Sequence, residues 1–136
     1  MKSPLEKLIF RDKDLTGNGW YGAKRGRKKH KAVDIIGTPG EDVFAPICGL
    51  VTKIGQVYAQ TTRFKYVEIT NDVYRIRLMY CKPSVKLNQL VVECDVIGVL
   101  QDVASYWNPE MKPHLHIQLW KHGLLTDPEP LLKLSD

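Results

Sequence analysis

One segment decides the fold of this chain: His114-Leu115-His116-Ile117-Gln118-Leu119-Trp120, near the C-terminal end. Side chains of a β-strand alternate between two faces, so residues two apart share a face. The two histidines therefore lie on one face, and the leucines and the isoleucine lie on the other. The aliphatic face predicts a buried core, and the histidine face predicts a polar or open groove.

Segments with strand-like composition recur through the preceding sequence, bounded by glycine, proline, asparagine and aspartate. We expect strands over residues 33–36, 43–46, 49–55, 64–70, 74–80, 96–100 and 114–120. Only the first several residues and the tail over 127–134 are expected to hold short helical turns. The predicted fold class is all-β, a mainly antiparallel sheet arranged as a sandwich or open barrel with little helix.

A second histidine motif, His30-Lys31-Ala32-Val33-Asp34, precedes most of these strands. Positions four apart in a strand share a face, and a carboxylate among buried aliphatic residues is costly unless it is paired or bound to metal. If the two histidine motifs lie side by side, two imidazoles and a carboxylate converge, with a further imidazole to spare. Such a group matches an open zinc site, which has three protein ligands and a position for water. Either motif alone is commonplace, but together they hold three of the four histidines.

The composition is that of an ordinary globular protein. The chain has 136 residues, of which 43% are hydrophobic and 26% charged. We expect one domain over 1–136, with its core about 20–121. No run approaches the roughly 20 apolar residues of a membrane span. We expect the three cysteines, Cys48, Cys81 and Cys94, to be reduced and mostly buried, although a single disulfide remains an alternative.

Basic residues crowd around His30 and contribute to a net charge of +5. They are Lys24, Arg25, Arg27, Lys28, Lys29 and Lys31. The stretch is interpreted as a solvated loop, or as a surface that attracts a polyanion. No nucleic-acid-binding motif accompanies it, so nucleic acid is not the expected partner. Binding through this loop would weaken steeply with salt.

Several blocks, taken in order, resemble a known family. They are Tyr21–Arg25 leading to His30–Ile35, Val43–Pro46 followed by Gly49–Thr52, Val85–Leu87 leading to Val96–Gly98, and Pro113–His116. In this order and spacing the chain resembles the lysostaphin-type zinc metallopeptidases, which are peptidoglycan endopeptidases. The resemblance covers nearly everything from Tyr21 to Trp120.

The resemblance implies a zinc-dependent endopeptidase that hydrolyses peptide bonds in bacterial peptidoglycan. It implies that His30, Asp34 and His116 ligate one Zn²⁺ ion, while His114 stands beside the open position as general base or acid. Zinc would lower the pKa of bound water towards about 7 and polarise the scissile carbonyl.

One departure from the family concerns Tyr80, which occupies the place of a histidine usual in active members. A tyrosine has a pKa near 10, so it accepts a proton less readily than imidazole, but it can donate to a developing oxyanion. A chemotaxin-like, non-peptidase variant of the family has the same substitution. The alternative function is therefore a catalytically impaired zinc-binding module that recognises a glycan, a receptor or a polyanion.

Smaller features complete the predictions. Asn88 and Cys94 stand where the family prefers glycine, and asparagine tolerates a left-handed backbone. Tyr106 and Trp107 either form a groove wall beside His114 or pack their own loop, and His122 is expected to be exposed. The first ten residues lack the features of a signal peptide. We therefore expect synthesis in the cytoplasm and action at the bacterial cell wall after delivery by phage or lysis.

Overall fold

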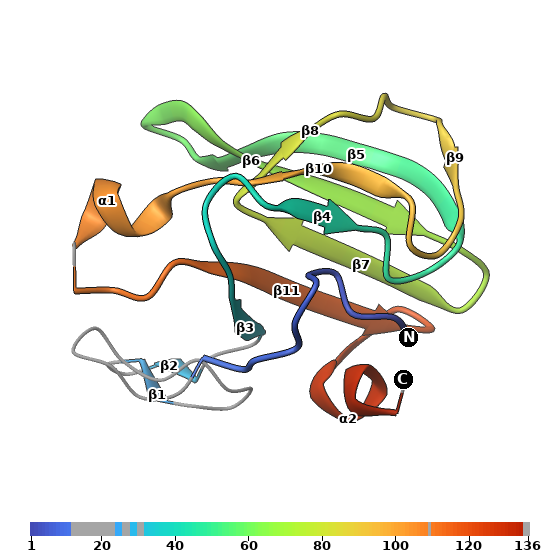
Figure 1. Cartoon of the computed structure of the whole chain (residues 1–136). Helices are drawn as coiled ribbons and strands as arrows, with labels where there is room; N and C mark the ends of the chain where they lie inside the picture. The colour runs from blue at the N-terminus through green and yellow to red at the C-terminus, as the bar shows by residue number, and fades with distance from the viewer. Residues whose placement is uncertain (12–23, 26–27, 30–31, 109, 135–136) are drawn as a thin grey trace.

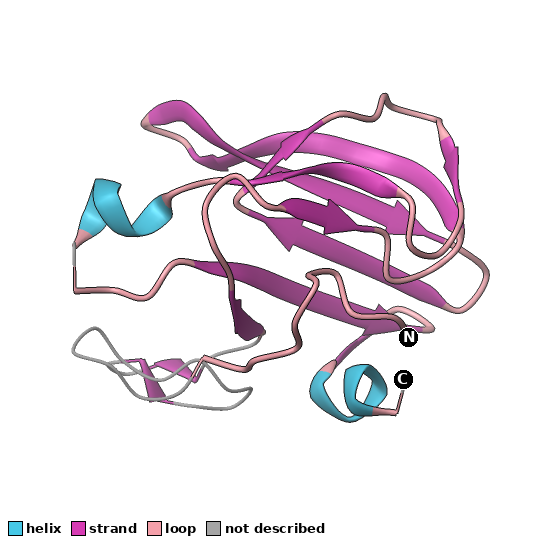
Figure 2. Ribbon diagram, in the orientation of Figure 1, coloured by secondary structure: helices cyan, strands magenta, loops and turns pink. Residues whose placement is uncertain are grey.

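The computed structural model describes residues 1–11, 24–25, 28–29, 32–108 and 110–134 (Figure 1). Antiparallel strands dominate these ranges, and two short helices accompany them (Figure 2). The strands are β1 (Lys24–Arg25), β2 (Lys28–Lys29), β3 (Val33–Ile36), β4 (Asp42–Phe44), β5 (Gly49–Tyr58), β6 (Thr61–Thr70), β7 (Tyr74–Met79), β8 (Cys81–Pro83), β9 (Leu90–Val91), β10 (Val96–Leu100), β11 (His114–Lys121) and β12 (Leu124–Thr126). The helices are α1 (Val103–Trp107) and α2 (Glu129–Lys133).

The described strands form one large sheet and two small ones. The large sheet runs in the order β12-β11-β7-β6-β5-β9, and β3 pairs with β11 beside this path. A three-stranded sheet, β4-β10-β8, lies against it, as Figure 1 shows, and β1 pairs with β2 separately. All of these pairings are antiparallel. The predicted fold class, an antiparallel all-β sandwich or open barrel, is confirmed.

The core lies between the two larger sheets. Val67, Ile76 and Ile117 of the large sheet share one cluster with Val43 and Ile97 of the three-stranded sheet, and all five are fully buried. Because alternate residues of these strands point inward, the opposite faces remain available for polar side chains. The same cluster also includes residues near both ends of the described chain, Leu5 and Leu132.

Helix α1 corrects one expectation from the sequence, since helix is not confined to the ends of the chain. Asp102 caps α1 by accepting a hydrogen bond from the backbone N–H of Ser105 at 3.1 Å. Val103 and Ala104 are buried, which anchors the short helix. The expected turn in the C-terminal tail is confirmed as α2. No helix of the described residues is both long and apolar enough for a membrane crossing.

The cysteines are only partly as expected. All three are free thiols, but Cys81 alone is buried, whereas Cys48 and Cys94 are exposed. Cys94 is exposed because it occupies a turn, with a left-handed φ of 72°. Asn88 adopts the left-handed conformation predicted for it, with a φ of 69°. His122 is exposed, also as predicted.

Candidate metal centre

The register of β11 brings the motif with His114 and His116 beside Asp34, the last residue of the other histidine motif. His116 pairs directly with Asp34 of β3 on one side and with Met79 of β7 on the other. Opposite residues of an antiparallel pair point to the same face, so the imidazole and the carboxylate are neighbours. Leu115, Ile117 and Leu119 point the other way and are fully buried. The alternation predicted for residues 114–120 is therefore confirmed.

Asp34 and His116 are in direct contact. Nδ1 of His116 lies 2.8 Å from Oδ1 of Asp34. Because an ionised carboxylate only accepts, the ring nitrogen donates. Nε2 of His114 lies 3.7 Å from Oδ2 of the same carboxylate, which is fully buried. Two of the three predicted ligands thus meet, and His114 stands beside them.

The third predicted ligand, His30, lies outside the described residues. Among the residues that are described, no group of three or more histidine, cysteine, aspartate or glutamate side chains gathers closely enough to hold a metal ion. The donor types that do meet, one carboxylate and one imidazole, are those that zinc takes in open sites. Asp34 and His116 therefore fit a zinc ion as part of its ligand set.

Burial and a backbone carbonyl define the state of His114. Its Nδ1 lies 2.8 Å from the carbonyl oxygen of Lys112. A carbonyl only accepts, so Nδ1 carries the proton and Nε2 of the neutral ring keeps its lone pair. Burial lowers the pKa of His114 from its ordinary value, and the negative charge of Asp34 opposes that effect. Burial thus favours the neutral form of His114, and its Nε2 lies 3.7 Å from Oδ2 of Asp34.

Arg11 also reaches this centre, and the sequence patterns do not predict it. Its Nη1 lies 3.0 Å from Oδ2 of Asp34, and the two side chains are 1% and 0% exposed. The N-terminal segment runs along β3, where the backbone N–H of Arg11 donates to the carbonyl of Asp34 at 2.7 Å and Phe10 bridges to Ile35. One carboxylate oxygen thus meets a guanidinium, and the other meets an imidazole.

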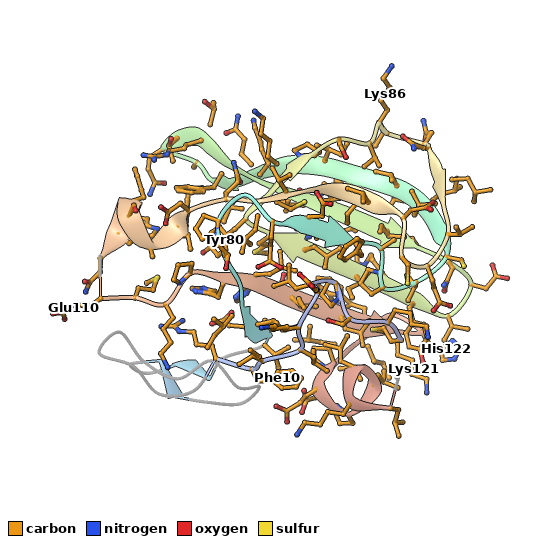
Figure 3. The ribbon with its side chains drawn as sticks, viewed as in Figure 1. Phe10, Tyr80, Lys86, Glu110, Lys121 and His122 are labelled. Carbon is orange, nitrogen blue, oxygen red and sulfur yellow. The ribbon has the colours of Figure 1, made fainter. Side chains whose placement is uncertain are left out.

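Tyr80 lies beside both histidines. It directly follows β7 and has a left-handed φ of 72°, which is rare for a bulky residue. Its ring is perpendicular to that of His114, with 5.6 Å between centroids, and its centroid is 6.4 Å from that of His116. Figure 3 shows Tyr80 near the end of β11 that carries the histidines. The structure therefore places the tyrosine ring next to both histidine rings.

A cavity of about 350 Å³ unites these side chains. It is lined by Arg11, Tyr58, Tyr80, Val103, Trp107, Met111, His114 and His116. Trp107 thus forms part of the wall that the sequence predicts. Tyr106 instead packs on Phe64, with 5.2 Å between ring centroids, and lies beneath the guanidinium of Arg63. Of these two residues, Trp107 lines the cavity, whereas Tyr106 packs its loop down onto β6.

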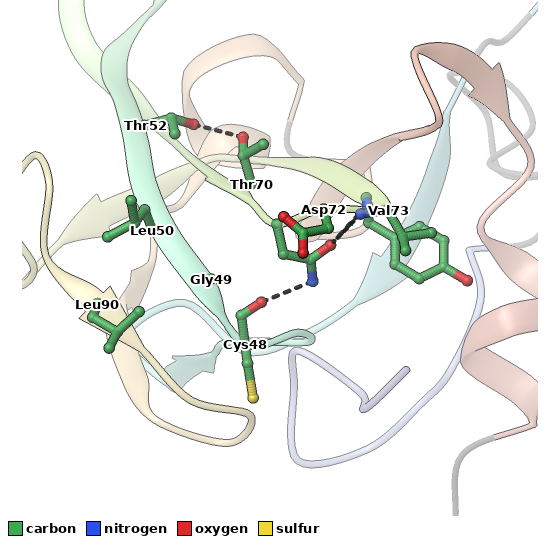
Figure 4. A pocket seen from close by; sticks show the side chains of 10 residues that line it. Cys48, Gly49, Leu50, Thr52, Thr70, Asp72, Val73 and Leu90 are labelled. Carbon is green, nitrogen blue, oxygen red and sulfur yellow. Dashed lines mark hydrogen bonds between the residues drawn. The ribbon is translucent and has the colours of Figure 1, made fainter.

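A larger hollow of about 700 Å³ lies at the other end of the large sheet (Figure 4). Its lining includes Cys48, Leu50, Asp72 and Leu90, but no histidine. The amide of Asn71 donates to the carbonyl of Cys48 at 2.8 Å, so polar groups here hold the sheet edge together. His114 and His116 therefore line the smaller cavity and not this hollow.

Known proteins resemble the chain in sequence and in fold. The model of Peptidase family M23 matches residues 28–128. Leukocyte cell-derived chemotaxin-2 of Bos taurus is 28% identical over 106 residues, which are 77% of this chain and 69% of that protein.

Two solved structures share the fold. The catalytic domain of the antimicrobial peptidase lysostaphin from Staphylococcus simulans is 25% identical, with a TM-score of 0.64 over 89% of this chain and 92% of that one. A zinc-containing peptidase from Vibrio cholerae is 21% identical, with a TM-score of 0.65 over 92% of this chain and 37% of that one. Because the family model spans well over half of the sequence, the chain belongs to Peptidase family M23.

Proposed function

We propose that this chain is a zinc-dependent endopeptidase that hydrolyses peptide bonds of bacterial peptidoglycan. One observation carries the proposal: Asp34 Oδ1 and His116 Nδ1 meet at 2.8 Å across β3 and β11. His116, the neighbouring His114 and Tyr80 line one cavity. Membership of a peptidase family and the likeness to lysostaphin support peptidoglycan as the substrate.

The metal would be held by His30, Asp34 and His116. Zinc bound there supplies an electrophile for the scissile carbonyl and a water of lowered pKa. Imidazole binds zinc through a ring nitrogen that carries no proton, and carboxylates bind it in the ionised form. Zinc affinity is therefore expected to fall as the pH is lowered.

His114 and Tyr80 would handle protons and charge. The Lys112 carbonyl orients His114 through Nδ1, so its Nε2 is available to accept a proton and return it to the leaving amine. Tyr80 cannot replace imidazole as a base at neutral pH, but its hydroxyl can donate to the carbonyl oxygen as that oxygen becomes negative. The two side chains thus have separate roles in one cavity.

Digestion of purified bacterial sacculi tests the function. We expect zinc-loaded protein to release free amines, and a chelator to stop the release. His116→Ala should lose the bound ion, whereas His114→Ala should keep it and slow the reaction by about 100-fold or more. His122→Ala is the matched control, because His122 is exposed in a turn away from the cavity. Wild-type protein that holds one zinc ion and releases no amines would contradict the proposal.

A second candidate function has its own support. The resemblance implies that Tyr80 takes the place of a catalytic histidine, and the chain is 28% identical to leukocyte cell-derived chemotaxin-2. Both observations favour a zinc-binding module that recognises another molecule without cutting it. Tyr80→His separates the two candidates: an inactive wild type beside an active variant would favour the binding module.

A further inference from the structure

Hydrogen bonds lead to Tyr80 from elements that carry none of the predicted metal ligands. Nε1 of Trp107, the last residue of α1, donates to the hydroxyl of Tyr58 at 3.0 Å. Tyr58 ends β5, and its hydroxyl oxygen lies 2.7 Å from the hydroxyl oxygen of Tyr80. Three residues that are far apart in sequence thus form a continuous row. All three line the cavity that contains His114 and His116.

The first bond of this row has a fixed direction. An indole N–H can only donate, so the Tyr58 oxygen accepts from Trp107. The proton of Tyr58 then has the Tyr80 oxygen at 2.7 Å as an acceptor. With Tyr58 as donor, the Tyr80 oxygen receives a hydrogen bond, and the proton of Tyr80 is directed to another acceptor. A substrate oxyanion in the cavity would be such an acceptor.

Ring packing holds the row in place. The Tyr58 ring makes edge contacts with Trp107 and Phe64, at centroid distances of 5.3 and 6.0 Å. Tyr80 is packed between Phe64 at 5.8 Å and His114 at 5.6 Å, nearly perpendicular to both rings. The backbone N–H of Tyr80 donates to the carbonyl of Lys65 at 2.9 Å, which holds its left-handed conformation. The Tyr80 ring is therefore fixed, and the direction of its hydroxyl proton is what the row determines.

We propose that Tyr58 and Trp107 are positioning residues that orient and polarise the Tyr80 hydroxyl towards the reacting carbonyl oxygen. This proposal rests on the proposed peptidase function. Each donor strengthens the next one, because hydrogen bonds in a row polarise one another. A Tyr80 oxygen that accepts a hydrogen bond from Tyr58 has a more polarised O–H, so Tyr80 is a stronger donor to the oxyanion than a phenol without such a neighbour. Trp107 and Tyr58 act through Tyr80 and do not contact the substrate oxygen themselves.

The indole proton of Trp107 gives a test that needs neither zinc nor substrate. The chain contains three tryptophans, and Trp107→Phe identifies the Trp107 signal in a ¹H–¹⁵N spectrum. Tyr58→Phe should move that signal upfield, because its acceptor is lost. Tyr80→Phe should also move it upfield by a smaller amount, although Tyr80 is not its partner. Tyr74→Phe, at the opposite end of β7, is the control and should leave it unchanged. An unmoved signal in Tyr80→Phe would overturn the row.

Kinetics on sacculi test the positioning role. We expect Tyr80→Phe to lower kcat by about 100-fold and Tyr58→Phe by about fivefold, both with KM unchanged. In a Tyr80→Phe background, Tyr58→Phe should have no further effect, because it acts through the missing hydroxyl. A fivefold loss that persists in this background, or that appears in KM, would contradict the role. If wild type digests no wall, the proposed function fails, and the indole signal alone decides whether the row exists.

Discussion

Replacing Arg11 with methionine tests how the buried carboxylate of Asp34 is compensated. Nη1 of Arg11 lies 3.0 Å from Oδ2, and the two side chains are 1% and 0% exposed. Removing one partner of a buried ion pair costs about 3–5 kcal/mol, because the other charge stays buried. Asp34 keeps its hydrogen bond from His116 at 2.8 Å, so we expect the lower end, about 3 kcal/mol. Methionine retains much of the apolar stem of arginine, which limits the packing loss.

Urea unfolding in the presence of a chelator measures this effect. Wild type, Arg11→Met, Asp34→Asn and the double variant form a cycle that isolates the pair. In the Asp34→Asn background, Arg11→Met should cost less than about 1 kcal/mol, since no buried anion remains to be compensated. Arg11→Lys keeps the charge and should lose less stability than Arg11→Met. Unfolding followed by fluorescence and by circular dichroism should give coincident transitions.

The same unfolding measurements are then repeated with added zinc. A cation held by Asp34 compensates the same carboxylate, so zinc should stabilise Arg11→Met more than wild type. The difference in stability between the two proteins should narrow as zinc is added. Two results would refute the reasoning from the ion pair. One is that Arg11→Met lowers the free energy of unfolding equally with and without Asp34→Asn. The other is that, in the presence of chelator, Arg11→Met alone lowers it by less than about 0.5 kcal/mol.

Three further outcomes follow from the packing and the caps. Burial raises the pKa of the Cys81 thiol from 9.0 to about 12, so its contribution to stability is intact below pH 9 and is lost as the pH rises towards 12. Between pH 9 and pH 12, the free energy of unfolding in urea should therefore fall by up to about 4 kcal/mol more for wild type than for Cys81→Ala. The same pH dependence in both proteins would contradict this prediction. Hydrogen bonds from Ser105 lower the pKa of Asp102, so its cap is present above the ordinary carboxyl pKa and is lost as the pH falls through the lowered one. Asp102→Ala should remove about 0.5–1 kcal/mol and this acid dependence, and an unaltered acid transition would argue against the cap. Gly98→Ala should lower stability by about 2 kcal/mol in thermal unfolding, because a Cβ there would meet the Lys82 carbonyl across β10 and β8. A variant as stable as wild type would show that the strands can separate without cost.

The long strands were predictable because each contains enough residues for a period to emerge. Residues 64–70 and 114–120 lie inside β6 and β11; β11 shows the expected alternation, whereas residues 66–69 of β6 are buried on both faces of the strand. Strands β8, β9 and β12 have two or three residues each, which is too few to show a period. Helix α1 was missed because five residues show no helical period, and its signal is the Asp102 cap. Short elements therefore depend on tertiary contacts that local sequence does not record.

The candidate site likewise contains residues that the sequence predicts and residues that it does not. The meeting of Asp34 and His116 follows from two strand motifs with matching faces, and the structure places the two residues directly opposite each other. Arg11 was not predictable, because the N-terminal segment carries no periodic pattern that would pair it with β3. Tyr58 was missed because its role depends on a hydroxyl contact with a residue 22 positions away. Periodicity locates ligands on strands, whereas the groups that surround them come from the packing of other segments.

The surroundings of Tyr80 change what its substitution should do. If tyrosine merely disables a histidine site, Tyr80→His should increase wall digestion. The hydrogen bonds that link Trp107, Tyr58 and Tyr80 instead end on a phenol, whose oxygen lies 2.7 Å from that of Tyr58. Histidine is shorter than tyrosine, so its ring nitrogens do not reach the position of the Tyr80 oxygen, and the variant should lose the hydrogen bond to Tyr58. We therefore expect Tyr80→His to digest sacculi more slowly than wild type, with its zinc content unchanged. A faster variant would show that the row of donors does not compensate for the absent imidazole.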